Sequence, residues 1–319
     1  MLDNLIYSAN AIFPIFFLVI LGAAIKKLGK ITDSFTEIAD WLVFKISLPV
    51  MLFLEVARSE LSENLDVKLI VYLIISVTLT FFLVSVIVAL AVKDKSKRGA
   101  LIQGICRANI AILGVPLAVN MFGEPGGQAI AIAIPFVIVM FNTYSVIILS
   151  IFTENVDSKF NKRTLIGILK NIVTNPLIIG VVLGAVFMVL RIKLPTFADK
   201  TLSYISNLTT PLALISLGAN FKTESLKGRI GYAVVGALGK TVIVPAIAIT
   251  GAALIGFRGP SLGVVLISFG APTAVTSYIM AKKMGNDHEL SAQILLLSTF
   301  LCLITIFLGI FILKSLALI

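Results

Sequence analysis

Stretches of about 20 apolar residues recur along the whole chain, and this is the length that a helix needs to cross the hydrocarbon core of a bilayer. Hydrophobic residues make up 58% of the 319 residues and charged residues only 13%, which excludes an ordinary soluble domain. We therefore expect an all-α integral membrane protein with ten transmembrane helices and short linkers. The expected spans are residues 5–25, 36–57, 67–92, 99–122, 127–152, 165–190, 198–220, 230–256, 260–282 and 289–316.

The net charge of +10 is distributed unevenly over the loops between these spans. If the N-terminus lies outside, 16 Lys and Arg residues fall in inside loops and 7 in outside loops and ends. The positive-inside rule then predicts that both termini are extracytoplasmic. We expect the protein to lie in the cell (inner) membrane. The surplus basic residues would face anionic lipid, so membrane lipid and not nucleic acid is the expected partner.

Several other features point to structural roles. Cys106 and Cys302 lie in apolar spans, so we expect packing residues and not a disulfide. No Lys or Arg precedes the first apolar stretch, so residues 5–25 are expected to be a retained helix and not a secretory signal. We expect no nucleophile elbow, zinc-protease motif or phosphate-binding loop, and therefore no enzyme, no catalytic residues, no cofactor and no metal. His288 is expected to be a solvated loop residue.

The chain carries an internal repeat. Two proline–glycine–proline sets share the spacings of 8 and 35 residues: Pro14, Gly22 and Pro49, and Pro176, Gly184 and Pro211. Several features in register indicate a duplication. Because each half holds an odd number of spans, the second half would be inserted upside down. We therefore expect two inverted five-helix repeats, residues 1–152 and 165–319, joined by a cytoplasmic linker at 153–164.

Two spans contain a proline two residues after a glycine, Pro116 after Gly114 and Pro272 after Gly270. Proline removes a backbone donor, and glycine tolerates backbone conformations that a helix does not use. In a bilayer such a break persists only where it is buried in protein or lines a cavity. Paired breaks in two halves are typical of the central binding site of secondary transporters. We expect the fourth and ninth helices to break at these prolines and to cross near the middle of the membrane.

Ionisable residues at membrane depth are costly and often functional. Lys45, Arg107 and Lys240 lie within expected spans, whereas Asp40 and Glu55 lie near the ends of the second span, where they could reach water. The guanidinium of Arg107 suits a carboxylate, or alternatively the carbonyls that a helix break exposes. Both lysines are expected to pack their stems against apolar neighbours and to extend their charges towards water, with contact to a substrate as the alternative.

Polar side chains flank both expected breaks. Asn109 would point away from Arg107 on a continuous helix, so the two can touch one ligand only if the helix unwinds between them. Asn120 follows the first break, and Thr273 and Thr276 follow the second. Such groups can bind a polar ligand, coordinate sodium or repair broken backbone.

The segment from Asn109 to Leu117, followed by Asn120 to Gly123, resembles the fourth-helix signature of the auxin efflux carrier family, and the segment from Pro272 to Gly285 resembles its ninth helix. The resemblance covers the full chain, with a short linker in place of the long central loop of plant members, as in a bacterial member. It implies the ten-helix fold of the bile-acid/sodium symporter superfamily. It also implies a scaffold of helices 1, 2, 6 and 7 and a mobile transport unit of helices 3–5 and 8–10.

The resemblance further implies a substrate site at the crossover that includes Asn109, Pro116 and Pro272. Arg107 replaces an apolar residue of the plant proteins, which argues against auxin, and bacterial relatives are associated with malate, malonate and similar acids. Together with the polar residues above, the expected substrate-binding residues are Arg107, Asn109, Gly114, Pro116, Asn120, Gly270, Pro272, Thr273 and Thr276.

We therefore expect a secondary carrier of small organic anions, working by an elevator-like alternating-access mechanism. Because no acidic residue is secure at the crossover, we expect the membrane potential to drive the transport. Sodium- or proton-coupled symport and an anion-sensing module that does not transport are the alternatives. A homodimer is an open option for the assembly.

Overall fold

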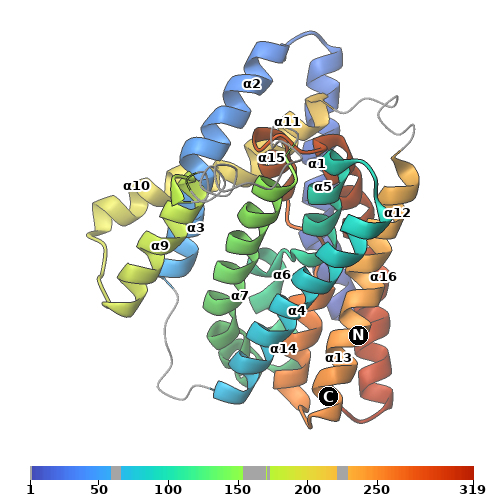
Figure 1. Cartoon of the computed structure of the whole chain (residues 1–319). Coiled ribbons are helices and arrows are strands. Elements are labelled where there is room, and N and C mark those ends of the chain that lie inside the picture. Colours follow the sequence, from blue (N-terminus) through green and yellow to red (C-terminus); the bar gives the residue numbers. More distant parts are fainter. Residues whose placement is uncertain (1, 59–65, 154–169, 171–172, 221–228) are drawn as a thin grey trace.

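The computed structural model describes residues 2–58, 66–153, 170, 173–220 and 229–319, and this part of the chain is helical, as expected, apart from short connections (Figure 1). In chain order the helices are α1 (Leu2–Lys27), α2 (Asp33–Leu42), the π-helix η1 (Val43–Ser47), α3 (Leu48–Ala57), α4 (Val67–Ala91), α5 (Lys95–Cys106), α6 (Ile110–Phe122), α7 (Glu124–Ile151), α9 (Pro176–Val189), α10 (Thr196–Asn207), α11 (Thr209–Asn220), α12 (Ile230–Leu238), the π-helix η3 (Gly239–Ile243), α13 (Val244–Leu254), α14 (Gly259–Gly270), α15 (Thr276–Lys283) and α16 (His288–Ser315). The predicted linker at 153–164 lies outside the described residues except for Thr153.

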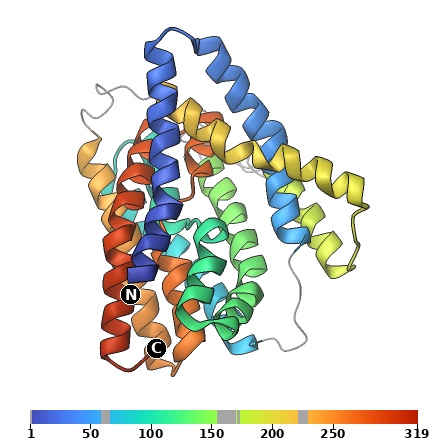
Figure 2. The same ribbon diagram turned by 180° about the vertical axis from the view of Figure 1, so that it is seen from behind.

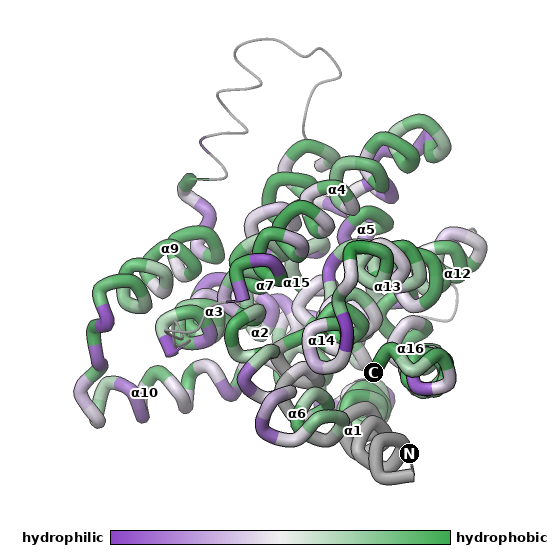
Figure 3. The backbone as a smooth tube through the Cα atoms, turned by 90° about the horizontal axis from the view of Figure 1, so that it is seen from below, coloured by the Kyte–Doolittle hydropathy of each residue, from purple (hydrophilic) through white to green (hydrophobic). Residues whose placement is uncertain are grey.

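Within the described chain, three helical runs are long and apolar enough to cross a membrane: Val67–Ala91, Glu124–Ile151 and Ile230–Leu254. A fourth is formed by α16 if its two halves, bent by 41°, count as one span. Shorter apolar helices, such as α9 and α14, occupy other predicted spans, while α10 carries many hydrophilic residues (Figure 3). A multi-pass membrane protein is therefore supported, and the number of ten spans stays a prediction.

The predicted spans 99–122 and 260–282, which hold the two Gly-x-Pro sequences, are each broken. α5 ends at Cys106 and α6 begins at Ile110, and α14 ends at Gly270 and α15 begins at Thr276. The second break contains Pro272, as expected. The prediction for Pro116 is wrong, because this residue lies inside α6, after the first break.

The position of the first break follows from pairing between the two broken segments. The amide of Asn109 donates to the carbonyl oxygen of Pro272 at 2.8 Å, and Ala108 and Thr273 form an antiparallel bridge. A buried backbone must find hydrogen-bond partners, and these segments find them in each other. The two breaks therefore meet, although they come from different halves of the sequence.

The helices pack in two groups, which we call the scaffold group (α1–α3 and α9–α11) and the crossover group (α4–α7 and α12–α16). α3 packs along α9 and α1 along α11, whereas α4 packs on α5 and α7, and α14 packs on α6, α7 and α13. In Figures 1 and 2, α2, α3, α9 and α10 lie together on one side of the molecule. This grouping matches the helices that the family resemblance assigned to a scaffold and a transport unit.

Close helix contacts in the scaffold group recur at a fixed sequence interval. A Cβ atom on Gly22 of α1 would collide with the carbonyl oxygen of Ile215 in α11, and one on Gly184 of α9 with that of Phe53 in α3. Gly22 and Gly184 are 162 positions apart, and so are Phe53 and Ile215. Small residues permit such close approach of membrane helices. The same kind of contact is thus made twice, between pairs of positions that lie 162 residues apart.

Candidate functional site

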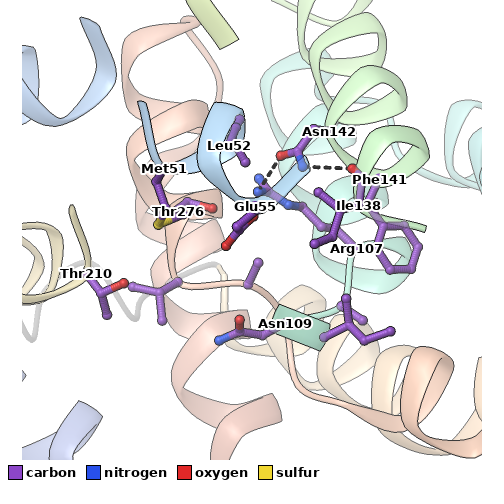
Figure 4. Close-up of a pocket in the computed structure, with 14 residues that line it drawn as sticks. Met51, Leu52, Glu55, Arg107, Asn109, Ile138, Phe141, Asn142, Thr210 and Thr276 are labelled. Atoms are coloured by element: carbon purple, nitrogen blue, oxygen red, sulfur yellow. Dashed lines mark hydrogen bonds between the residues drawn. The ribbon is translucent and has the colours of Figure 1, made fainter. Parts of the chain in front are cut away.

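A cavity of about 60 Å³ lies where the two breaks meet (Figure 4). A cavity needs about 10–15 Å³ to hold one water, so this space suits a few waters or one small molecule. Both helix groups contribute to its wall. Its lining residues are Met51, Leu52 and Glu55 of α3; Arg107, Ala108, Asn109 and Ile110 at the first break; Ile138, Phe141 and Asn142 of α7; Thr210 of α11; and Ala274, Val275 and Thr276 at the second break.

Unwinding of the first break brings Arg107 and Asn109 to the same cavity. The amide of Arg107 still donates to the carbonyl oxygen of Gln103 at 2.9 Å, but its own backbone is already extended, at φ −83° and ψ 123°. On a continuous helix the two side chains would point to nearly opposite sides. The helix is unwound between Arg107 and Asn109, so both side chains can touch one ligand in this cavity.

Arg107 is 4% exposed, and side chains hold its guanidinium group. Nη2 donates to Oδ1 of Asn142 at 2.8 Å (Figure 4). Nη1 contacts the sulfur of Met280. Asn142 in turn donates from Nδ2 to the carbonyl oxygen of Ile138 at 2.8 Å, which turns its amide oxygen towards the arginine. Within the described chain, these bonds do not go to carbonyls of either break. The arrangement favours a guanidinium positioned for an anion over one that repairs backbone.

Glu55 is the acidic residue of this cavity. Its side chain lies beside Arg107 in Figure 4, and the opposite charges of the two groups attract each other. Glu55 lies two residues before the end of α3 and is half-buried, as expected, and it also contacts the crossover. The end of α3 packs against the crossover group, and the carboxylate faces that group. The expectation that no acidic residue is secure at the crossover is wrong, because Glu55 lines the cavity there.

Asp40 and Lys240 also differ from expectation. Asp40 of α2 is fully buried, accepts a hydrogen bond from Ser216 and pairs with Lys282 of α15 at 2.6 Å. Lys240 in η3 is fully buried and donates to the carbonyl oxygen of Phe269 at 2.8 Å, near the end of α14. Neither of these two side chains is exposed, whereas Lys45 lies at the surface of the protein.

The residues of the second break divide into two roles. Thr276 lines the cavity, and its buried hydroxyl has no hydrogen-bond partner among the described residues. Thr273 instead donates its hydroxyl to the carbonyl oxygen of Gly104 at 2.7 Å, and its backbone amide donates to Oγ of Ser298 at 3.2 Å. Thr273 therefore satisfies a backbone carbonyl next to the first break. The carbonyl oxygen of Pro272 likewise accepts a hydrogen bond from the backbone amide of Asn109.

The remaining predicted site residues do not line this cavity. Gly270 lines a separate, largely apolar cavity between α13, α14 and α16. Gly114 is buried within α6, against Ile110 and Ile130. Pro116 and Asn120 lie on the backbone of α6, and their side chains are outside the described part of the structure.

The sequence reasoning missed Met51 and Thr210, which carry no signal that separates them from ordinary membrane residues. Asn142 and Glu55 do carry such a signal, because each is a polar residue in or beside an apolar span. Glu55, Met51 and Thr210 also line a second cavity of about 410 Å³, together with Leu54, Arg58, Ser206 and Asn207. The second cavity extends from the crossover cavity to the exposed side chain of Arg58.

The expectation that no nucleophile-elbow pattern occurs is wrong at the level of sequence, because Gly259 to Gly263 match Gly-x-Ser-x-Gly. The pattern opens α14 and does not follow a strand, and Ser261 donates its hydroxyl to Asp66 at 3.2 Å. An elbow needs a strand-to-helix turn. Both cysteines are free and buried, as expected. Among the described residues, no group of three His, Cys, Asp or Glu side chains could hold a metal ion.

Comparison with known proteins gives consistent similarities along the chain. A family model described as membrane transport protein matches residues 7–310. An uncharacterized transporter of Methanocaldococcus jannaschii is 26% identical over 93% of this chain and 96% of its own length. An uncharacterized transporter of Methanothermobacter thermautotrophicus is 25% identical over 94% and 96%. A protein of Rhizobium meliloti whose name proposes malonate as its transported substrate is 24% identical over 92% of each chain.

Proposed function

Because this chain belongs to the family of membrane transport proteins that includes the auxin efflux carriers, we propose that it is a secondary carrier of small organic anions. The substrate carboxylate would bind Arg107 at the crossover. One observation carries the proposal. The guanidinium of Arg107, the side-chain amide of Asn109 and the hydroxyl of Thr276, which has no partner among the described residues, line one small cavity where two broken helices meet.

The chemistry of these groups suits a short carboxylate or dicarboxylate. A guanidinium binds a carboxylate through two parallel hydrogen bonds. The side-chain amide of Asn109 and the hydroxyl of Thr276 supply further donors. The backbone at the start of α6 adds the partial positive charge of a helix N-terminus. A volume of about 60 Å³ limits the ligand to a small one. The name of the relative from Rhizobium meliloti makes malonate the first compound to test.

The proposed architecture is a pair of inverted repeats in the inner membrane, with both termini outside. The duplicated glycine contacts of Gly22 and Gly184 support it. α7 and α16 support it too, since both have 28 residues and they begin 164 positions apart, at Glu124 and His288. An odd number of spans in each repeat would give the two halves opposite orientations.

Alternating access would arise from movement of the crossover group against the scaffold group. The cavity lies between them, since α3 and α11 provide Glu55 and Thr210 while the breaks provide Arg107 and Thr276. The second cavity would give access from the side of Arg58, which is the outside in the proposed orientation. The ion pair between Asp40 and Lys282 joins the two groups at the other side. An elevator-like step would carry the anion past the scaffold.

Two sources of energy are compatible with this site. An anion that leaves a cell negative inside gains about 2.3 kcal/mol per charge per 100 mV, so export needs no coupling ion. Proton-linked transport is the second candidate, and the position of Glu55 beside Arg107 favours it.

A thermal-shift screen of mono- and dicarboxylates on purified protein tests the proposed binding class, because a ligand that binds the folded state raises its stability by mass action. We expect malonate or a similar short dicarboxylate to raise the melting temperature in the parent protein. The Arg107→Ala variant should show no shift. Stabilisation by organic cations or sugars, with none by carboxylates, would contradict the proposal.

A further inference from the structure

The carboxylate of Glu55 lies next to the guanidinium that the proposed substrate must reach. Glu55 comes from α3 of the scaffold group, and Arg107 from the first break of the crossover group, and both line the same cavity (Figure 4). The inference rests on the proposed function, in which Arg107 binds an organic anion. It concerns what happens to Glu55 when that anion arrives.

The charged groups around Glu55 are few. Among the residues that line its two cavities, the other charged side chains are Arg107 and Arg58. Arg58 is already paired with Asp199 of α10 at 2.7 Å and with Ser203 at 2.5 Å. The described residues of α7, α9 and α11 present no charged side chain to either cavity. Glu55 is therefore the counter-charge of Arg107, and the empty cavity is close to neutral.

A bound anion would place a second carboxylate on the same guanidinium. Asn142 and Met280 already occupy positions around Arg107, so the anion has to share the face that Glu55 uses. The cavity of about 60 Å³ keeps the two carboxylates near each other. Two carboxylates that share one buried site strongly favour protonation of one of them.

The surroundings decide which carboxylate takes the proton. A bound substrate would have the donors of Arg107, Asn109 and Thr276 for its ionised form. Glu55 also lines the wider cavity of about 410 Å³, which extends to the exposed Arg58, so water can deliver a proton to it. The ionised substrate is thus better stabilised than the ionised glutamate.

We propose that Glu55 is the proton-binding group of this site. In the empty protein it is ionised and neutralises Arg107. On anion binding it takes up one proton from solution on a carboxylate oxygen and releases Arg107 to the substrate. One anion and one proton enter together, no other bond changes, and each ligand raises the affinity for the other.

The test measures protons and anion binding on the same full-length protein, with malonate as the probe. Malonate is added to purified protein in weakly buffered solution near pH 7.5, where malonate itself stays ionised, and a pH indicator reports proton uptake. We expect wild-type protein to take up close to one proton per bound malonate. Its Kd should fall by up to about tenfold for each pH unit of acidification, which is the limit for one linked proton.

Glu55→Gln removes the titrating group and keeps the shape of the side chain. This variant should bind malonate more tightly than wild type at pH 8, without proton uptake and with little dependence of Kd on pH. Asp33→Asn is the matched control, because it removes one carboxylate from an exposed site paired with Lys26. It should behave as wild type in both measurements.

Three results would overturn the inference. Binding to wild type without proton uptake would do so even if Glu55→Gln does not fold, and so would uptake that persists in Glu55→Gln. In both cases malonate binds and the proposed function stands. If wild type and Glu55→Gln bind none of the mono- and dicarboxylates at any pH, the proposed function itself fails, and the role of Glu55 with it.

Discussion

The backbone amide of Asn109 donates a hydrogen bond to the carbonyl oxygen of Pro272, 2.8 Å away, and so joins the two broken helices at one point. The adjacent bridge between Ala108 and Thr273 extends the contact. Each broken segment thus supplies the hydrogen bonds that the other lost. This pairing leaves the side chains of Arg107 and Asn109 free to line the cavity.

Thr273 and Thr276, both at the second break, are expected to have different roles: the first stabilises the fold and the second binds the anion. Thr273→Val removes the hydroxyl bonded to the buried carbonyl oxygen of Gly104, so we expect a loss of about 1–3 kcal/mol in stability. Thr276→Val removes a hydroxyl without a described partner, so stability should change by less than about 0.5 kcal/mol while anion affinity falls. Thermal unfolding with and without malonate measures both. Equal destabilisation by the two changes would contradict these roles.

Arg107→Lys should lower transport by about tenfold or more while the protein still folds. Lysine keeps the positive charge but cannot bind Asn142 and a carboxylate through one planar group, and a hydrogen bond to a charged group contributes about 1.5–3 kcal/mol. Arg258→Lys, at an exposed position, is the control and should transport normally. Initial rates of malonate uptake into proteoliposomes provide the comparison. If Arg107→Lys transports malonate at the wild-type rate, Arg107 does not bind the substrate.

The buried ion pair between Asp40 and Lys282 predicts an asymmetry. Lys282→Met leaves the fully buried Asp40 without its counter-charge, which costs about 3–5 kcal/mol. Asp40→Asn should cost less, because the side chain of Lys282 is 20% exposed and can reach water. Melting temperatures should therefore fall in the order wild type, Asp40→Asn, Lys282→Met, and the double variant should be more stable than the sum of the two losses predicts. The reverse order of the single variants would contradict this.

The duplicated glycine contacts predict matched effects in the two halves. Gly22→Ala and Gly184→Ala each force a methyl group against a backbone carbonyl, so each should cost about 1–3 kcal/mol. Gly231→Ala is the control, since a Cβ there meets nothing within 4 Å and alanine is the better helix former. It should leave the melting temperature unchanged or raise it. Tolerance of alanine at Gly22 or Gly184 would show that the close packing is not needed.

The apolar spans predicted the helices well because burial in lipid demands long apolar segments whatever their neighbours are. The expected span 127–152 corresponds to α7 at Glu124–Ile151, and 67–92 to α4 at Val67–Ala91. The matched spacing of Gly22 and Gly184 to their flanking prolines could also be read from the sequence, and both glycines pack closely on a neighbouring helix, whereas the inverted repeat itself stays a prediction.

Features set by distant contacts could not be predicted in the same way. Pro116 is a strong local signal, yet the first break lies at Arg107 to Asn109, where a partner strand of backbone is available from the second break. Hydropathy places Glu55 near a helix end but cannot show that Arg107 packs there from another part of the chain. The sequence therefore predicted that polar residues gather where the two breaks meet, but it did not predict the acidic residue of the cavity there.

Counterflow in proteoliposomes tests the central claim, that this chain carries organic anions through the site at Arg107, most directly. Vesicles that contain purified protein are loaded with excess unlabelled malonate and diluted into a trace of labelled malonate. A carrier predicts transient accumulation of label above equilibrium in wild type, and none in Arg107→Ala or in protein-free vesicles. Binding of malonate without any accumulation of label would indicate an anion sensor, and accumulation that is equal in Arg107→Ala would place the substrate elsewhere; either result would contradict the account.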